Sequence, residues 1–259
     1  MKHSSQALAA KHAMVTGGAR GIGAAVTRSL VAHGAKVTML GRSAARLLPA
    51  ELAGGPHVQY VQADVCDPER VGRAFDSARA TFGPIHILVN NAGQASSAPF
   101  AKTDLALWRS MMMVNLDGTF HCIHAVLPAM LDAGWGRIVN VASTAGLTGY
   151  SYVSAYCAAK HGVVGLTRSL ALEVATKGIT VNAVCPGYTE TEMLERTVAG
   201  IVAKTGRSVA EAREILSARN PQKRMVQPEE VANAVAWLCL PGSEAITGQS
   251  IAIAGGEVM

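Results

Sequence analysis

Ser143, Tyr156 and Lys160 are three side chains whose types and spacing could carry out proton transfer. Tyr156 and Lys160 lie four residues apart in a segment with a helical pattern, and residues at this spacing share one face of a helix. A phenol has an ordinary pKa of about 10, but a neighbouring ammonium favours the phenolate and lowers that pKa. The sequence therefore predicts that Tyr156 acts as a general acid or base, although such pairs also occur by chance on solvated helices.

Ser143 follows the apolar run 138–142, which predicts a strand that ends at this serine. Open α/β sheets bind their ligands beyond the carboxyl ends of the strands. Ser151 and Ser154 also lie nearby in the sequence, but only Ser143 ends a strand. We therefore expect Ser143 to lie beside the bound ligand.

Apolar runs alternate with amphipathic or alanine-rich segments along the whole chain. Strands are expected at residues 12–16, 36–40, 58–63, 85–90, 137–143, 180–185 and 250–254. Helices are expected at residues 21–33, 44–52, 68–82, 105–133, 154–177 and 228–239. Continuous apolar strands are typical of a parallel sheet that is covered on both faces. The alternation therefore predicts an α/β doubly wound fold, with a seven-stranded parallel sheet flanked by helices on both faces.

Length and composition fit a single domain over residues 1–259. The chain has 49% hydrophobic residues, only 16% charged residues and 26 glycines, which suits a tightly turned sheet protein. The net charge of +5 is spread without a long basic run, and no motif supports a nucleic-acid partner.

The five cysteines are widely spaced and form no Cys-x-x-Cys pair, which is typical of thiols in a reducing compartment. Residues 1–11 lack the apolar core of a signal peptide, and no apolar run approaches the length of a membrane span. The scattered histidines suggest no metal site. We expect a cytoplasmic protein with no membrane association and no metal.

A glycine-rich loop, Thr16-Gly17-Gly18-Ala19-Arg20-Gly21-Ile22-Gly23, follows the first expected strand and opens the first expected helix. Glycines let a backbone approach a pyrophosphate, and free N–H groups at a helix start favour its negative charge. A purely structural turn is the alternative. The position between strand and helix favours a dinucleotide site.

The second expected strand ends at Gly41-Arg42. Sites selective for NAD usually carry an acid here for the ribose 2′-hydroxyl, whereas an arginine accommodates a 2′-phosphate. Gly41 leaves no acid at this place, and Arg42, with Arg20 from the glycine loop, supplies positive charge. The sequence favours NADP(H), with NAD(H) possible.

These motifs together resemble the short-chain dehydrogenase/reductase family over almost the whole chain, which implies a Rossmann-type fold. The glycine loop is similar to Thr-Gly-x3-Gly-x-Gly, residues 90–93 are similar to Asn-Asn-Ala-Gly, and 186–191 are similar to Pro-Gly-x3-Thr. The resemblance implies the catalytic residues Asn115, Ser143, Tyr156 and Lys160. It also implies cofactor contacts from Gly17, Arg20, Gly21, Ile22, Gly23, Arg42, Asp64, Val65, Asn91, Ala92, Gly93, Tyr156, Lys160, Pro186, Gly187, Thr189 and Thr191.

The resemblance implies hydride transfer between the nicotinamide and a carbonyl carbon. Tyr156 would exchange the proton with the substrate oxygen, and Ser143 would hydrogen-bond that oxygen. Lys160 would lower the tyrosine pKa and hold the nicotinamide ribose, while Asn115 would position a water in a proton relay.

The expected activity is interconversion of a secondary alcohol and a ketone, because the sequence resembles bacterial 3-oxoacyl-thioester reductases and 3-hydroxyacyl-CoA dehydrogenases. Other small alcohols, sugars or aromatic ketones are alternative substrates, and an NADP-sensing regulator is the non-enzymatic alternative. The final glycine pair follows Ile253-Ala254 where the family usually has an acid. The family further implies a homotetramer that acts on a small-molecule substrate.

Residues 188–220 follow the expected sixth strand and carry apolar side chains at near-helical spacing, with Gly200 and Gly206 between them. We expect a substrate lid here, an amphipathic helix with glycine breaks; a surface insertion is the alternative. Substrate-pocket candidates by position are Leu147, Tyr150, Tyr188 and Met193. Gly162 and Gly165 lie within the catalytic helix, where close helix packing would explain them.

Overall fold

The computed structural model describes residues 6–43 and 55–259, and the expected helix 44–52 lies outside these ranges. Within them, seven parallel strands form one sheet in the order β3-β2-β1-β4-β5-β6-β7. The strands are β1 (His12–Thr16), β2 (Lys36–Gly41), β3 (Val58–Gln62), β4 (Ile87–Asn90), β5 (Gly136–Val141), β6 (Ile179–Pro186) and β7 (Ser250–Ile253). The strand order reverses between β1 and β4, so the predicted Rossmann-type doubly wound fold is confirmed.

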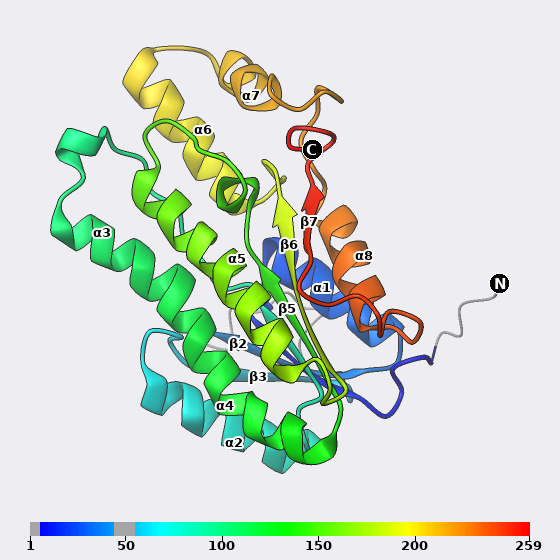
Figure 1. Ribbon diagram of the computed structural model, residues 1–259. Helices are drawn as coiled ribbons and strands as arrows, with labels where there is room; N and C mark the ends of the chain where they lie inside the picture. The colour runs from blue at the N-terminus through cyan, green and yellow to red at the C-terminus, as the bar shows by residue number, and fades with distance from the viewer. Residues whose placement is uncertain (1–5, 44–54) are drawn as a thin grey trace.

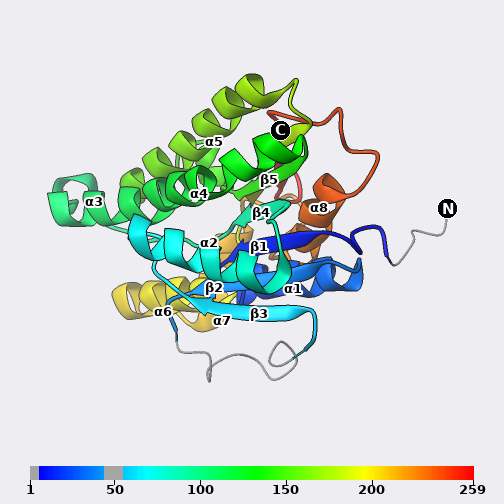
Figure 2. The ribbon, with the colours of Figure 1, turned by 90° about the horizontal axis from the view of Figure 1, so that it is seen from below.

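Helices cover both faces of the sheet, with α1 and α8 on one side and α2, α4 and α5 on the other (Figures 1 and 2). The α-helices are α1 (Gly21–Ala32), α2 (Pro68–Phe82), α3 (Leu105–Met112), α4 (Gly118–Ala133), α5 (Ser154–Val174), α6 (Glu192–Thr205), α7 (Val209–Ser217) and α8 (Pro228–Cys239). Short turns of other helical types are η3 (Phe100–Lys102), η4 (Met113–Asp117) and η5 (Thr144–Gly146).

The two helical layers produce two separate apolar cores because neighbouring strand residues point to opposite faces of the sheet. Met14 and Leu88 join the core under α2, α4 and α5. Val15 and Val89, one residue further along the same strands, join the core under α1 and α8. All four side chains are fully buried, which explains why the strands are continuous apolar runs.

The expected helix 105–133 is three elements, because the π-helical turn η4 separates α3 from α4. A π-helical turn inserts an extra residue into a helix and often marks a functional site. This turn contains Asn115, whose side chain is buried. The prediction of one uninterrupted helix was wrong, since η4 contains no glycine or proline that would indicate the interruption.

The two glycines in α5 have different surroundings. A Cβ on Gly162 would lie 2.8 Å from a methyl carbon of Leu116, so a side chain there would collide with η4. Gly165 has no atom within 4 Å of such a Cβ. Close helix packing therefore explains Gly162 but not Gly165.

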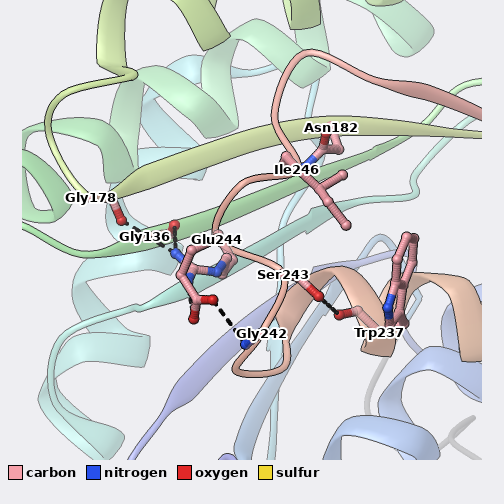
Figure 3. A network of polar contacts seen from close by, with 9 residues as sticks. Gly136, Gly178, Asn182, Trp237, Gly242, Ser243, Glu244 and Ile246 are labelled. Carbon is pink, nitrogen blue, oxygen red and sulfur yellow. Dashed lines mark hydrogen bonds and ion pairs between the residues drawn. The ribbon is translucent and has the colours of Figure 1, made fainter.

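A polar network fixes the connection between α8 and β7 (Figure 3). The hydroxyl of Ser243 donates to the carbonyl oxygen of Trp237 at 2.6 Å, and the amide of Asn182 donates to the carbonyl oxygen of Ile246 at 2.7 Å. The buried guanidinium of Arg137 lies 3.4 Å from Glu244 in the same connection. These contacts fix β7 at the edge of the sheet and so position the C-terminal segment that follows it.

Candidate active site

Ser143 and Tyr156 meet beyond the carboxyl end of β5. The strand ends at Val141 rather than at the expected Ser143, which instead caps η5 and accepts a hydrogen bond from the N–H of Ala145 at 3.1 Å. The side chain of Ser143 also lies near the phenol of Tyr156, which is partly buried. Burial raises the pKa of Tyr156 to about 12, and the neighbouring Ser143 offsets part of that increase.

Lys160 is almost fully buried, and its Nζ donates to the carbonyl oxygen of Val141 at 2.8 Å. The Nζ lies 5.7 Å from the centroid of the Tyr156 ring. Burial lowers the pKa of Lys160 to about 8. The net shift of the Tyr156 pKa is upward because of burial, so the lowering expected from the ammonium of Lys160 stays a prediction.

The side chain of Asn115 is held in place by the segment that follows β4. Its Nδ2 donates to the carbonyl oxygens of Gln94 at 3.0 Å and Met111 at 2.9 Å, and its Oδ1 accepts from the N–H of Gln94 at 3.2 Å. Gly93 leaves the space for this arrangement, since an added Cβ would lie 2.9 Å from the Asn115 oxygen and 3.7 Å from Lys160 Nζ. The structure thus brings Asn115 and Lys160 to the same glycine.

The glycine loop has the shape that a pyrophosphate requires. Gly17 and Gly21 adopt positive φ angles of 64° and 50°, and a Cβ on Gly23 would lie only 2.1 Å from the carbonyl oxygen of Gly17. Arg20 occupies the N-cap of α1 without a side-chain capping bond, so N–H groups of the first turn remain available to an anion. The side chain of Ile22 packs into the core below. The loop therefore fits a dinucleotide.

Asn91 supports this loop from β4. Its Nδ2 donates to the carbonyl oxygens of Thr16 at 2.9 Å and Gly17 at 3.2 Å. The hydroxyl of Thr16 in turn accepts from the N–H groups of Asn91 and Ala92, both at 2.9 Å. The side chain of Asn91 therefore shapes the predicted cofactor site and is already occupied by these bonds.

Arg42 is exposed at the end of β2, and no ion pair engages it among the described residues. Tyr60 of β3, which sequence analysis missed, holds the adjoining backbone because its hydroxyl donates to the carbonyl oxygen of Ser43 at 2.6 Å. A Cβ on Gly41 would lie 3.0 Å from this hydroxyl. Arg20 instead forms an exposed ion pair with Glu192 at 3.2 Å. Sequence analysis could have identified Tyr60 only if the pairing of β2 with β3 had been known.

Asp64 and Val65 follow β3 and have local partners. Asp64 accepts a hydrogen bond from the N–H of Cys66 at 3.0 Å. Val65 is buried, and a Cβ on Gly118 would lie 2.7 Å from it. The pair forms a tight turn between β3 and α2.

The segment that leads from β6 into α6 contains four of the predicted cofactor contacts, Pro186, Gly187, Thr189 and Thr191. The N–H of Gly187 donates to the carbonyl oxygen of Ile253 at 3.1 Å, and the buried Thr189 donates to the carbonyl oxygen of Gly187 at 2.9 Å. Thr191 caps α6, and a Cβ on Gly21 would lie 3.0 Å from its methyl group. This segment therefore lies directly against the glycine loop.

The expected lid is a pair of helices with an apolar core of its own. Gly200 lies inside α6 without breaking it, and Gly206 ends that helix with a positive φ of 70°. The expected glycine break within the helix was therefore wrong at Gly200. Arg213 of α7 pairs with Glu190 at 2.8 Å and also with Glu195. The core is formed by Leu194, Val198, Ala212, Leu216 and Met225.

The four substrate-pocket candidates lie in three different places. Leu147 packs against the core beside β5 and β6, while Tyr188 packs against the core of α6 and α7 and Met193 lies in the first turn of α6, partly buried. Tyr150 contacts Thr144 and also Glu257 from the C-terminal segment. Glu257 was missed by sequence analysis, because an acid near a chain end has no local signal of function.

The fold and this site define a dinucleotide-binding oxidoreductase. Residues 11–201 match the family model for short chain dehydrogenase. The chain belongs to the short-chain dehydrogenase/reductase family, and it is an enzyme of the class that acts on CH–OH groups with NAD(P). The predicted family is confirmed.

The relatives extend over almost the whole chain. D-beta-hydroxybutyrate dehydrogenase from Rhizobium meliloti is 35% identical over 95% of this chain and 98% of its own length. The 3-oxoacyl-[acyl-carrier-protein] reductase from Synechocystis is 38% identical over 98% of this chain and 99% of its own. A crystal structure of an actinorhodin polyketide ketoreductase variant with NADPH superimposes with a TM-score of 0.91 at 39% identity, covering 95% of this chain and 97% of the other.

No helix within residues 6–43 and 55–259 is both long enough and apolar enough to cross a bilayer.

Proposed function

We propose that the protein interconverts a ketone and a secondary alcohol, with Tyr156 as the residue that exchanges a proton with the substrate oxygen. The observation that carries this proposal is the proximity of Ser143 to the partly buried phenol of Tyr156, with Lys160 one turn further along the same helix. A substrate oxygen held by both hydroxyls would gain a hydrogen bond from Ser143 as negative charge develops on it.

The nicotinamide supplies or accepts the hydride when it is bound. In the reducing direction Tyr156 gives its proton to the carbonyl oxygen, and in the oxidising direction it removes the proton of the alcohol. Lys160, buried behind the phenol, holds positive charge there below a pH of about 8 and stabilises the phenolate that remains after proton donation. Asn115, fixed by Gln94 and Met111, keeps the segment beside Gly93 and Lys160 in place.

NADP(H) is the proposed cofactor. Arg42 is exposed at the carboxyl end of β2 and Gly41 provides no competing acid, so the guanidinium can pair with a 2′-phosphate. The related ketoreductase structure contains NADPH, which supports the same choice. NAD(H) is the alternative, and direct comparison of the two cofactors decides between them.

A 3-oxoacyl or 3-hydroxyacyl thioester is the proposed substrate. The Synechocystis relative, named as a 3-oxoacyl-[acyl-carrier-protein] reductase, and the similar ketoreductase structure support this class. The hydroxybutyrate dehydrogenase relative favours a small hydroxy acid as a second candidate. A sugar or aromatic alcohol is a third, and an NADP-sensing regulator without turnover is the non-enzymatic alternative.

A spectrophotometric screen of NADPH oxidation with a panel of ketones tests these alternatives. We expect turnover with acetoacetyl-CoA, and faster turnover than with acetoacetate, simple sugars or aromatic ketones. Binding of NADPH without oxidation by any ketone would support the regulator. Turnover confined to acetoacetate would support the small hydroxy acid.

We also propose that the protein is a cytoplasmic homotetramer in which residues 188–220 form a substrate lid on a single domain. Exposed apolar side chains on η4, α4 and α5, including Met113, Phe120 and Leu172, support contacts between subunits through these elements. All five cysteines are free thiols, which supports a reducing compartment. Light scattering coupled to size-exclusion chromatography measures the mass of the assembly.

A further inference from the structure

Glu257 brings a carboxylate from the C-terminal end of the chain to the loop that follows β5. It lies four residues beyond the end of β7, where its N–H donates to the carbonyl oxygen of Ala254 at 3.1 Å. Figure 1 shows this C-terminal segment in red, at the same end of the sheet as α6 and α7. The side chain is partly buried.

One oxygen of this carboxylate is connected through Tyr150 to the loop that follows β5. The Tyr150 hydroxyl lies 2.6 Å from Glu257 Oε1 and 2.8 Å from the hydroxyl of Thr144. A phenol has one proton and a carboxylate only accepts, so Tyr150 donates to Glu257 and accepts from Thr144. Two hydrogen bonds therefore connect the negative charge of Glu257 to Thr144. Thr144 directly follows Ser143, the proposed catalytic serine.

The other oxygen lies beside the segment that leaves β6. Oε2 is 3.1 Å from the position that a Cβ on Gly187 would occupy, and no hydrogen bond to it exists within residues 6–43 and 55–259. The next residue, Tyr188, has a pKa raised first by burial and then by Glu257, and Tyr188 in turn contributes to the raised pKa of Tyr156. Glu257 therefore lies among Tyr150, Gly187 and Tyr188, and Tyr188 is the member of this group that neighbours Tyr156.

Arg219 provides the opposite charge on the other side of Tyr150. Its guanidinium carbon lies 4.8 Å from the centroid of the Tyr150 ring, and the residue is exposed. Solvent screens an exposed charge more strongly than a partly buried one. The negative charge of Glu257 is therefore screened less than the positive charge of Arg219, and it acts more strongly on groups near Tyr150.

We propose that Glu257 determines which substrate charge the site accepts: it disfavours ketones that carry a free carboxylate next to the reacting carbonyl, and it tolerates their neutral thioesters. This inference rests on the proposed function, because it requires ketone reduction at Tyr156. Like charges repel more strongly in a partly desolvated site than in water. A substrate without a carboxylate at this position avoids the repulsion, so discrimination arises from rejection of the anion.

The test compares acetoacetate with its neutral N-acetylcysteamine thioester, using NADPH and measuring kcat/KM for both. The unmodified protein is expected to prefer the thioester by at least about tenfold, since unfavourable like-charge contacts cost several kcal/mol. Glu257→Gln keeps the shape and removes the charge, so the acetoacetate-to-thioester ratio should increase by about tenfold. Glu257→Asp retains the charge and should keep the original ratio. Asp132→Asn, which removes an exposed acid at the end of α4, is the matched control and should leave the ratio unchanged.

Several outcomes would overturn the inference. Preference of the unmodified protein for acetoacetate would do so without any variant. An acetoacetate-to-thioester ratio in Glu257→Gln within about twofold of the original would also overturn it. So would a change of this ratio in Glu257→Asp as large as that in Glu257→Gln, because it would indicate a packing effect. Lack of turnover with every ketone would overturn the proposed function together with this inference, whereas turnover with an unchanged ratio would overturn this inference alone.

Discussion

The ammonium of Lys160 donates to the carbonyl oxygen of Val141, at 2.8 Å, rather than to the hydroxyl of Tyr156. The lysine is thereby anchored to the last residue of β5, and the phenol keeps a raised pKa of about 12. Tyr156 is therefore protonated throughout the neutral range. In this state it is prepared to donate a proton, as ketone reduction requires.

Replacement of Tyr156 by phenylalanine should reduce kcat by roughly two to four orders of magnitude, since general acid catalysis contributes roughly 10²–10⁴-fold. NADPH affinity should stay within about threefold, because the hydroxyl that is removed lies near Ser143 and is proposed to contact the substrate. Turnover at saturating cofactor and fluorescence titration with NADPH measure the two quantities. Tyr152→Phe, at an exposed tyrosine nearby, is the matched control; normal turnover in Tyr156→Phe would disprove the assignment.

Lys160 should make the free energy of unfolding depend on pH. Its pKa is lowered from 10.5 to about 8 in the folded protein, so between these values the unfolded chain binds more protons and stability rises with pH. Relative to Lys160→Met, the unmodified protein should gain roughly 2–3 kcal/mol between pH 8 and pH 10, at 1.36 kcal/mol per pKa unit. Urea unfolding at a series of pH values measures this gain.

The matched control for that experiment is Lys177→Met, because Lys177 is an exposed lysine just beyond the end of α5. It should show no change in relative stability over the same range. A flat difference between the unmodified protein and Lys160→Met would mean that the ammonium stays hydrated in the folded protein.

Arg42→Ala should weaken NADPH selectively and leave NADH nearly unaffected. A charge-assisted hydrogen bond is worth about 1.5–3 kcal/mol, so the ratio of kcat/KM for the two cofactors should change by about tenfold or more. Arg70→Ala, which removes an exposed arginine from α2, is the control and should leave the ratio unchanged. Equal kcat/KM for NADH and NADPH in the unmodified protein would count against the role of Arg42.

Gly41→Asp should change the cofactor preference in the same direction, because its carboxylate would repel a 2′-phosphate. The Tyr60 hydroxyl lies 3.0 Å from the new Cβ and must move aside, so Gly41→Asp combined with Tyr60→Phe separates the steric cost from the charge effect. A double variant that still prefers NADPH as strongly as the unmodified protein would contradict the placement of the phosphate.

The amides of α6 and α7 should exchange hydrogen faster than those of β4 and β5, and they should become protected when NADPH and a substrate analogue bind. Arg213→Ala removes the two ion pairs with Glu190 and Glu195, so kcat/KM should fall severalfold while the melting temperature changes little. Arg73→Ala, whose exposed ion pair lies on α2, is the control. Slow exchange that ignores ligands would identify the segment as fixed scaffold.

The sequence was sufficient to predict the seven strands in their order along the chain, because continuous apolar runs are a local pattern. Leu88 and Val89 illustrate this, since a parallel sheet buried on both faces requires apolar residues at both positions. Local spacing also indicated that Tyr156 and Lys160 lie close together, and the structure places them so. The direction of the Lys160 side chain was not predicted, because it depends on a carbonyl group nineteen residues away.

Tyr60 and Glu257 were missed for a related reason. Tyr60 acts on the end of β2 through pairing between strands, and Glu257 contacts Tyr150 from a segment 107 residues further along the chain. Neither residue type is unusual for its local sequence. Only the folded arrangement shows that Tyr60 holds the backbone next to Arg42 and that Glu257 contacts Tyr150.

The π-helical turn at 113–117 makes the length of this segment as important as its residue types. Each added or removed residue rotates the rest of a helix by about 100°. Deleting one residue there would let α3 and α4 merge into one regular helix, and the bonds of Asn115 to Gln94 and Met111 would be lost together. Substitutions can be tolerated at several of these positions, but the deletion of one residue cannot. The gene is therefore expected to tolerate missense changes in this segment far better than in-frame deletions or insertions.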